Sequence, residues 1–193
     1  MEPVLISALV VALAEIGDKT QLLAILLATR FRRPLPIIAG ILCATIANHL
    51  AAATAGYFIS GLLKGPWFRI FVGASFLAMA AWTLVPDKAD DGPKSDSRWG
   101  AFGATLVSFF LVEIGDKTQI ATVALAARYH SVFKVALGTT IGMMAADIPA
   151  VFLGEAATKI VPVRYVRWGA AAIFALLGLW VLAETFGWIG GAS

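Results

Sequence analysis

Six long apolar stretches dominate the sequence, and each is long enough to form a membrane-spanning helix. About 20 apolar residues carry an α-helix across the hydrocarbon core of a bilayer. No stretch shows the alternation of apolar and polar residues that is typical of a membrane β-barrel. The pattern predicts an all-α integral membrane protein with six transmembrane helices, at residues 4–28, 35–59, 67–85, 100–127, 133–157 and 165–187.

Proline, glycine and charged residues gather in the segments between these stretches, as expected for connections between helices. Only the segment at residues 86–99 is both long and polar. We interpret it as a loop that joins two halves of the chain, residues 1–85 and residues 100–193.

The two halves share a motif. The sequence Glu-Ile-Gly-Asp-Lys-Thr-Gln occurs at residues 15–21 and again at residues 113–119, an offset of 98 residues. The same offset aligns further identities without a gap, including Trp82 with Trp180. Composition alone does not produce such an identity, so the chain contains an internal duplication. Each half has an odd number of spans. We therefore expect inverted repeats, with a binding site near the midplane between them as in secondary transporters.

The composition agrees with lipid as the main solvent of the chain. Of its 193 residues, 60% are hydrophobic and 14% are charged, and the mean hydropathy is +0.84. Soluble domains carry about 25% charged residues. The net charge of +3 does not indicate a nucleic-acid partner, because the basic residues lie in short clusters between the apolar stretches.

The distribution of basic residues predicts the orientation. Nine Lys and Arg residues lie on the side of the first, third and fifth connections, and four lie on the other side. The positive-inside rule places the first side in the cytoplasm. We therefore expect a cytoplasmic central loop and both termini outside.

Each motif places charged side chains in the middle of an apolar stretch. In a continuous helix Glu15, Asp18 and Lys19 would share one face, and the second motif would repeat this arrangement. A charged side chain at the bilayer centre costs at least about 2.5–3.5 kcal/mol. We therefore expect an ion pair between Glu15 and Lys19, together with a hydrated cavity.

The remaining charge predicts a divalent cation site. Each motif has two acids and one lysine, so two facing motifs leave about two negative charges, which one divalent cation or two protons would neutralise. Carboxylate and amide oxygens suit Mg²⁺, Ca²⁺ or Mn²⁺. The ion is cargo, and we expect no cofactor and no catalytic residue. The predicted metal ligands are Glu15, Asp18, Gln21, Glu113, Asp116 and Gln119.

Other residues are predicted to support this site or to couple it to protons. On the second helix of each half, we expect Asn48 rather than His49 to face the site, and Asp147 to be an ion or proton ligand. Threonine in the motif either serves the ion or bonds back to the carbonyl four residues earlier. The motif lysines either pair with the acids or stand in for the ion in the empty state. The supporting candidates are Lys19, Lys117, Asn48, Asp147, Thr20 and Thr118.

The motif glycines, Gly17 and Gly115, have two interpretations. A glycine in the middle of a span lets helices pack closely. It also lets the helix unwind locally, which would free backbone carbonyls as further ligands.

The duplicated motif resembles the E-x-G-D-[KR]-[ST] signature of the UPF0016 family, also called the Gdt1 family, and the resemblance covers essentially the whole chain. Members of that family are described as transporters that exchange Mn²⁺ and Ca²⁺ for protons, and bacterial relatives look like manganese exporters. The resemblance implies an exporter of Mn²⁺ in a prokaryotic plasma (inner) membrane. It also implies that Glu15, Asp18, Glu113 and Asp116 are the essential acids.

Other functions stay open at this stage. A Ca²⁺/H⁺ antiporter of broad selectivity is the main alternative, because oxygen ligands alone do not separate Mn²⁺ from Ca²⁺. An exporter of small organic ions would need a counter-charge for its substrate, and a channel would need a less occluded site. A metal-dependent membrane enzyme would need a phosphate clamp, whereas the arginines lie at the predicted helix ends. The expected partners are divalent cations, protons and the lipid bilayer, in a monomer or a homodimer.

Overall fold

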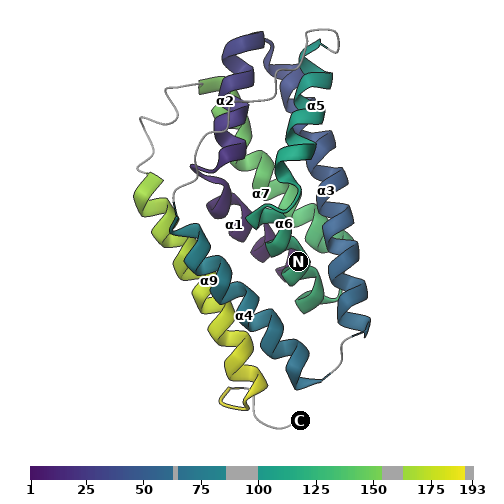
Figure 1. Cartoon of the computed structure of the whole chain (residues 1–193), viewed down its shortest axis with the longest axis vertical. Coiled ribbons are helices and arrows are strands. Elements are labelled where there is room, and N and C mark those ends of the chain that lie inside the picture. Colours follow the sequence, from purple (N-terminus) through teal and green to yellow (C-terminus); the bar gives the residue numbers. More distant parts are fainter. Residues whose placement is uncertain (63–64, 86–99, 154–162, 190–193) are drawn as a thin grey trace.

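The computed structural model describes residues 1–62, 65–85, 100–153 and 163–189, and every regular element in these ranges is a helix (Figure 1). The predicted central loop at residues 86–99 lies outside the described residues. The first half contains α1 (Glu2–Glu15), α2 (Lys19–Phe31), α3 (Pro34–Leu62) and α4 (Pro66–Thr83). The second half contains α5 (Gly100–Glu113), α6 (Lys117–Tyr129), α7 (Val132–Leu153) and α9 (Val163–Thr185).

Two of the six predicted stretches are each divided into two helices. The stretch at 4–28 is broken between α1 and α2, and the stretch at 100–127 is broken between α5 and α6. Both breaks fall inside the repeated motif. The expectation that the motif charges share one face of a continuous helix is therefore wrong, because the helix ends at the glutamate and restarts at the lysine.

The two broken stretches have the same design. The helices before the breaks each have 14 residues, and the helices after them each have 13. Both α2 and α6 end at a residue in the left-handed conformation, Arg32 with φ 52° and His130 with φ 48°, and these positions are again 98 residues apart. In Figure 1, α1 and α2 follow one another along the long axis, as do α5 and α6.

Three of the described helices are by themselves long and apolar enough to cross a membrane, at Pro34–Leu62, Val132–Leu153 and Trp168–Thr185. Neither half of a broken stretch reaches that length alone. The structure is consistent with a membrane protein, and six complete spans remain a prediction.

Each broken stretch packs against the long helix of the other half. α1 lies on α7, and α5 lies on α3. Glycine permits both close approaches. A Cβ placed on Gly40 of α3 would lie 2.8 Å from Cβ of Thr105, and one placed on Gly138 of α7 would lie 2.8 Å from Cβ of Ser7. Both members of this contact are shifted by the same 98 residues, so the packing repeats together with the sequence.

α4 and α9 form a separate pair along one side of the bundle (Figure 1). Their backbones approach at Gly73 and Gly178, where a Cβ on either glycine would meet the other helix. Glu184 of α9 also accepts a hydrogen bond from Arg128 of α6 at 2.8 Å. This contact ties the pair to the bundle.

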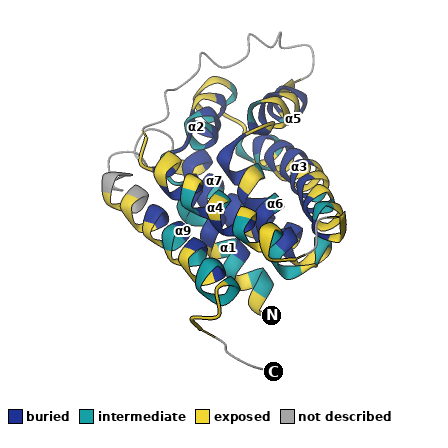
Figure 2. Ribbon diagram, turned by 60° about the horizontal axis from the view of Figure 1, so that its bottom comes forward, coloured by how far each residue is buried: buried dark blue, intermediate teal, exposed yellow. Residues whose placement is uncertain are grey.

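Many large apolar side chains lie on the outer surface and the motif acids lie inside, and Figure 2 shows that the buried residues face the interior of the bundle. Leu5, Phe58, Phe71 and Phe133 are more than half exposed, whereas the motif acids are buried. In a water-soluble protein Asp and Glu are almost never fully buried unless they are paired. A lipid solvent accounts for the outer surface, and the inner one requires a functional explanation.

Candidate functional site: two helix breaks with buried carboxylates

Each motif forms a tight turn between two helices. After Glu15, Ile16 has φ −63° and ψ 116°, Gly17 has φ 79°, and the backbone N–H of Asp18 donates to the carbonyl of Glu15 at 2.9 Å. These values describe a type II turn, whose third residue needs a positive φ and is therefore usually glycine. The second motif repeats the turn, with Gly115 at φ 75°. Of the two interpretations of the motif glycines, local unwinding is the one observed.

The motif glutamines hold these turns. Oε1 of Gln21 accepts the backbone N–H of Gly17 at 2.8 Å, and Oε1 of Gln119 accepts that of Gly115 at 2.7 Å. The amide nitrogen of Gln21 also donates to the carbonyl of Ala146 on α7 at 3.2 Å. The oxygens predicted to ligate metal thus already satisfy a backbone donor that the helix break leaves without a partner.

The motif lysines pair across the two halves. Nζ of Lys19 lies 3.1 Å from Oδ1 of Asp116, and Nζ of Lys117 lies 2.5 Å from Oδ1 of Asp18. The expected pair between Glu15 and Lys19 is wrong, because the turn removes the helical spacing that would bring them together. Two reciprocal ion pairs therefore join the break in one half to the break in the other.

The motif threonines donate to the aspartates of their own turns. Thr20 Oγ1 lies 3.5 Å from Asp18 Oδ2, and Thr118 Oγ1 lies 3.4 Å from Asp116 Oδ2. The alternative expectation, that these hydroxyls bond to the carbonyl four residues earlier, is not what the structure has. Each aspartate thus contacts a lysine of the other half and a threonine of its own.

Glu113 is surrounded by polar groups from α3. Asn48 Nδ2 donates to its Oε2 at 3.0 Å. His49 Nε2 lies 2.8 Å from its Oε1, a close contact that lacks the alignment of a hydrogen bond. The expectation that His49 faces away from the site is wrong. The repeat offset, which pairs His49 with Asp147, is the signal in the sequence that could have identified it.

Glu15 and Asp147 are buried without hydrogen-bond donors to their carboxylates in the part of the chain that the structure describes. Both are fully inaccessible to solvent, and none of their four carboxylate oxygens has a hydrogen-bond partner within the described residues. Four other acids lie close enough to repel the negative charge of Glu15, and the repulsion from Asp147 is the strongest of the four. A buried polar group without a partner is costly, so the burial of these four oxygens is not explained by the hydrogen bonds of the described residues.

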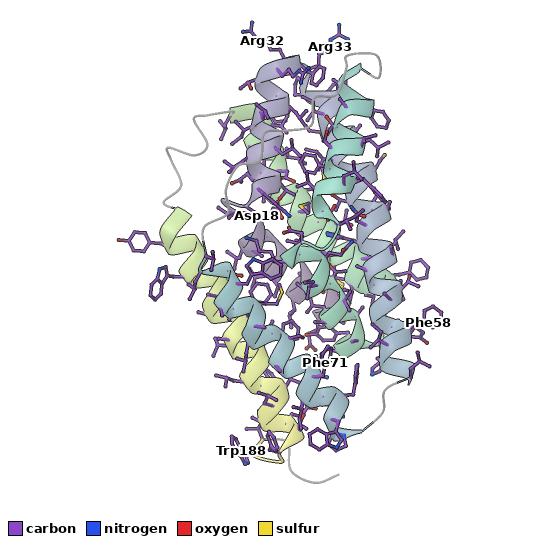
Figure 3. The ribbon with its side chains drawn as sticks, in the orientation of Figure 1. Asp18, Arg32, Arg33, Phe58, Phe71 and Trp188 are labelled. Carbon is purple, nitrogen blue, oxygen red and sulfur yellow. The ribbon has the colours of Figure 1, made fainter. Side chains whose placement is uncertain are left out.

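The arrangement is not a closed metal cage. Among the residues that the structure describes, no three His, Cys, Asp or Glu side chains gather closely enough to hold one metal ion. The lysine ammonium groups contact the aspartates instead. Asp18 lies about midway along the long axis, between Arg32 and Arg33 at one end and Trp188 at the other (Figure 3).

Buried carboxylates and ammonium groups at two broken helices, inside an apolar helical bundle, are the features of a membrane transporter for ions. The model of the family described as "Divalent cation/proton antiporter GDT1" matches residues 3–91 and 101–188. The chain belongs to this family and is a transporter, not an enzyme. The two matched stretches begin 98 residues apart, at the offset of the motif.

Curated relatives agree with this assignment. A protein of Vibrio cholerae serotype O1 named "Putative manganese exporter" is 47% identical over 180 residues, which cover 93% of this chain and 90% of the relative. Two Arabidopsis thaliana proteins, GDT1-like protein 4 and GDT1-like protein 5, are each 25% identical over 86% of this chain and 89% of their own length. No solved structure matches the chain.

Proposed function

We propose that this protein exports Mn²⁺ from the cytoplasm in exchange for protons, through a carboxylate site between its two halves. The observation that carries the proposal is the meeting of two broken helices at buried acids, joined by the ion pairs Lys19–Asp116 and Lys117–Asp18. Broken helices supply both side-chain and backbone ligands in ion-coupled transporters. The name of the Vibrio cholerae relative supports Mn²⁺ as the cargo.

The charge of the site favours cations. Five buried carboxylates face two lysine ammonium groups, which leaves three formal negative charges when all are ionised. Metal ligands must be deprotonated, so metal and protons compete for the same oxygens. If only the metal-loaded and the protonated forms reorient, this competition becomes exchange.

In this proposal the lysines stand in for the cargo in the empty transporter. Each ammonium neutralises an aspartate of the other half. An entering divalent ion would displace them and release Asp18 and Asp116 as ligands. Gln21 and Gln119 remain secondary candidates, because a carbonyl oxygen that accepts one hydrogen bond has a second lone pair for an ion.

The proposed topology is two inverted three-helix repeats, residues 1–85 and 100–193, in the plasma membrane. Support comes from the contacts that recur at the 98-residue offset and from the excess of Lys and Arg on one side of the predicted spans. The central loop would then be cytoplasmic and both termini external. Such repeats exchange access to a fixed site between the two sides of a membrane.

The decisive experiment is Mn²⁺ transport into proteoliposomes with and without a pH gradient, using a fluorescent metal indicator inside. We expect gradient-dependent uptake, and a loss of at least about 100-fold in Asp18→Asn and in Asp116→Asn, because each removes a carboxylate ligand. Glu184→Gln is the matched control, since Glu184 is an acid of α9 paired with Arg128. It should transport like the wild type.

The alternatives give different results in the same experiment. Equal uptake of Ca²⁺ would identify a Ca²⁺/H⁺ antiporter of broad selectivity, the second candidate that oxygen ligands allow. Uptake that ignores the pH gradient would rule out proton exchange. If both aspartate variants transport Mn²⁺ normally, the carboxylates are structural and the proposed site is wrong.

A further inference from the structure

The two halves of the site differ chemically at one repeated position. His49 of α3 and Asp147 of α7 are 98 residues apart, and both are fully buried. His49 lies beside Glu113. Glu15 is the first residue of its motif, as Glu113 is of the other. The 98-residue offset therefore makes Glu15 the counterpart of Glu113, and it pairs Glu15 with Asp147 as Glu113 is paired with His49. A basic group thus accompanies one glutamate, and a second acid accompanies the other.

The packing of α1 on α7 brings Asp147 to the level of Glu15. Gly142 of α7 lies against the backbone of Ala8 and Ala12. One further turn along both helices leads to Asp147 and to Glu15, the last residue of α1. After the turn, Gln21 of α2 donates a hydrogen bond to the carbonyl of Ala146, the residue before Asp147. This bond also holds the motif turn next to Asp147.

The pair Glu113–His49 and the pair Glu15–Asp147 differ in their hydrogen-bond partners. Glu113 accepts a hydrogen bond from the amide of Asn48 at Oε2, and its Oε1 lies 2.8 Å from Nε2 of His49 without the alignment of a hydrogen bond. Glu15 and Asp147 receive no hydrogen bond from the described residues at any of their four oxygens. Two buried acids without a donor between them require a cation or protons.

We propose that the transported divalent cation binds at the pair Glu15–Asp147, and that His49 fills the equivalent place beside Glu113. The proposal rests on the proposed function and makes its site asymmetric. Glu15 and Asp147 would join Asp18 and Asp116, which the ion releases from the two lysines, as carboxylate ligands. The last carbonyl groups of α1, which have no helical partner, are available as further oxygen ligands. The expected ligand is a hard divalent cation such as Mn²⁺ or Ca²⁺.

Equilibrium binding of Mn²⁺ to the purified protein in lipid nanodiscs tests the first half of this inference. Electron paramagnetic resonance of free Mn²⁺ gives both affinity and stoichiometry. We expect Asp147→Asn to lower the affinity at least about 100-fold and Asp147→Glu to retain it within about tenfold. The control Glu184→Gln, an acid of α9 outside the site, should still bind about one Mn²⁺ per chain. Wild-type affinity in Asp147→Asn overturns the proposal.

A gain of binding tests the second half. His49→Asp makes the Glu113 side chemically equivalent to the Glu15 side, so the stoichiometry should rise from about one to about two Mn²⁺ per chain. This variant decides the question even if Asp147→Asn does not fold, because an unchanged stoichiometry overturns the asymmetry. A wild-type protein that transports no Mn²⁺ refutes the proposed function itself. Normal transport with normal binding in Asp147→Asn refutes this inference alone.

Discussion

At the scale of single residues, the site is held together by charges that cross between the two halves. Lys117 is the more enclosed lysine, since its side chain is 3% exposed while that of Lys19 is 24% exposed. The attraction within a buried pair offsets the desolvation of both ions, but removing one partner leaves an uncompensated charge. The two ion pairs are related by the repeat and differ in their surroundings.

This difference predicts unequal costs for two equivalent substitutions. Lys117→Met should lower the free energy of unfolding by about 3–5 kcal/mol, because Asp18 stays buried without its ammonium partner. Lys19→Met should cost less, because its pair has access to solvent. Thermal unfolding in detergent measures both, and the double variant Lys117→Met with Asp18→Asn should recover most of the loss. Equal losses in the two single variants would contradict the difference in burial.

The residue types of the site could be predicted from the sequence, but their pairing could not. The two identical motifs identify Glu15, Asp18, Glu113 and Asp116 as candidates. Helical spacing then suggests a partner within the motif, whereas the actual partners are 97 and 99 residues away in sequence. Only the folded chain brings such distant side chains within 4 Å of one another.

At the scale of elements, the defining feature is the turn that interrupts each motif-bearing helix. The turn is stabilised by a glycine with positive φ and by a glutamine that accepts the N–H of this glycine. It ends the first helix at a glutamate and begins the second after an aspartate, so both acids project from helix termini. The positive end of α2 or α6 lies at the aspartate, which helps to stabilise its negative charge.

The positive φ at the third residue of each turn favours glycine, and this preference can be tested. Gly115→Ala should destabilise the protein by about 1–2 kcal/mol, because alanine is strained at φ 75°, although no described residue beyond the chain neighbours lies within 4 Å of the added methyl group. Gly61→Ala is the control. It lies in α3, also in open space, and there alanine should be neutral or stabilising. Similar effects of the two substitutions would mean that the conformation of the turn carries no cost.

The close contacts of α1 with α7 and of α5 with α3 also require glycine. Gly40→Val and Gly138→Val should each weaken the packing of a broken helix on a long one, because a Cβ at either glycine already meets the neighbouring helix. We expect both to reduce transport and lower the unfolding temperature to a similar extent. Gly169→Val of α9 is the matched control, because its Cβ would meet no neighbouring helix within 4 Å among the described residues. A loss confined to one member of the pair would argue against equivalent crossings.

At the scale of the whole molecule, the acids of the motifs and Asp147 lie at the centre, and many large apolar side chains lie on the outside. Figure 3 places Arg32 and Arg33 at one end, and Trp188 and the C-terminal end of α9 at the other. The proposed orientation puts the arginine end in the cytoplasm. The acids would then lie deep in the bilayer, reachable from either side only after the halves rearrange.

The orientation predicts a labelling pattern in intact bacterial cells. In a Cys43→Ser background, Trp188→Cys should react with a membrane-impermeant maleimide, and Arg33→Cys should react only after the cells are opened. Both positions are exposed, so access to the reagent depends on the side of the membrane. The opposite pattern would invert the proposed direction of transport, and labelling of both sites in intact cells would contradict the topology.

The sequence by itself determined the helical class, the duplication and the family, because hydropathy and an exact seven-residue repeat are local properties that survive without coordinates. The tertiary structure decided the rest. Helical periodicity is the same for a continuous helix and for one broken at glycine. The sequence therefore left both local unwinding and close helix packing open as the role of the motif glycines. The ion pairs across the halves, the contact of His49 with Glu113 and the unpartnered oxygens of Glu15 and Asp147 depend on how distant helices pack. Packing is a property of the folded chain, and neither motif contains that information alone.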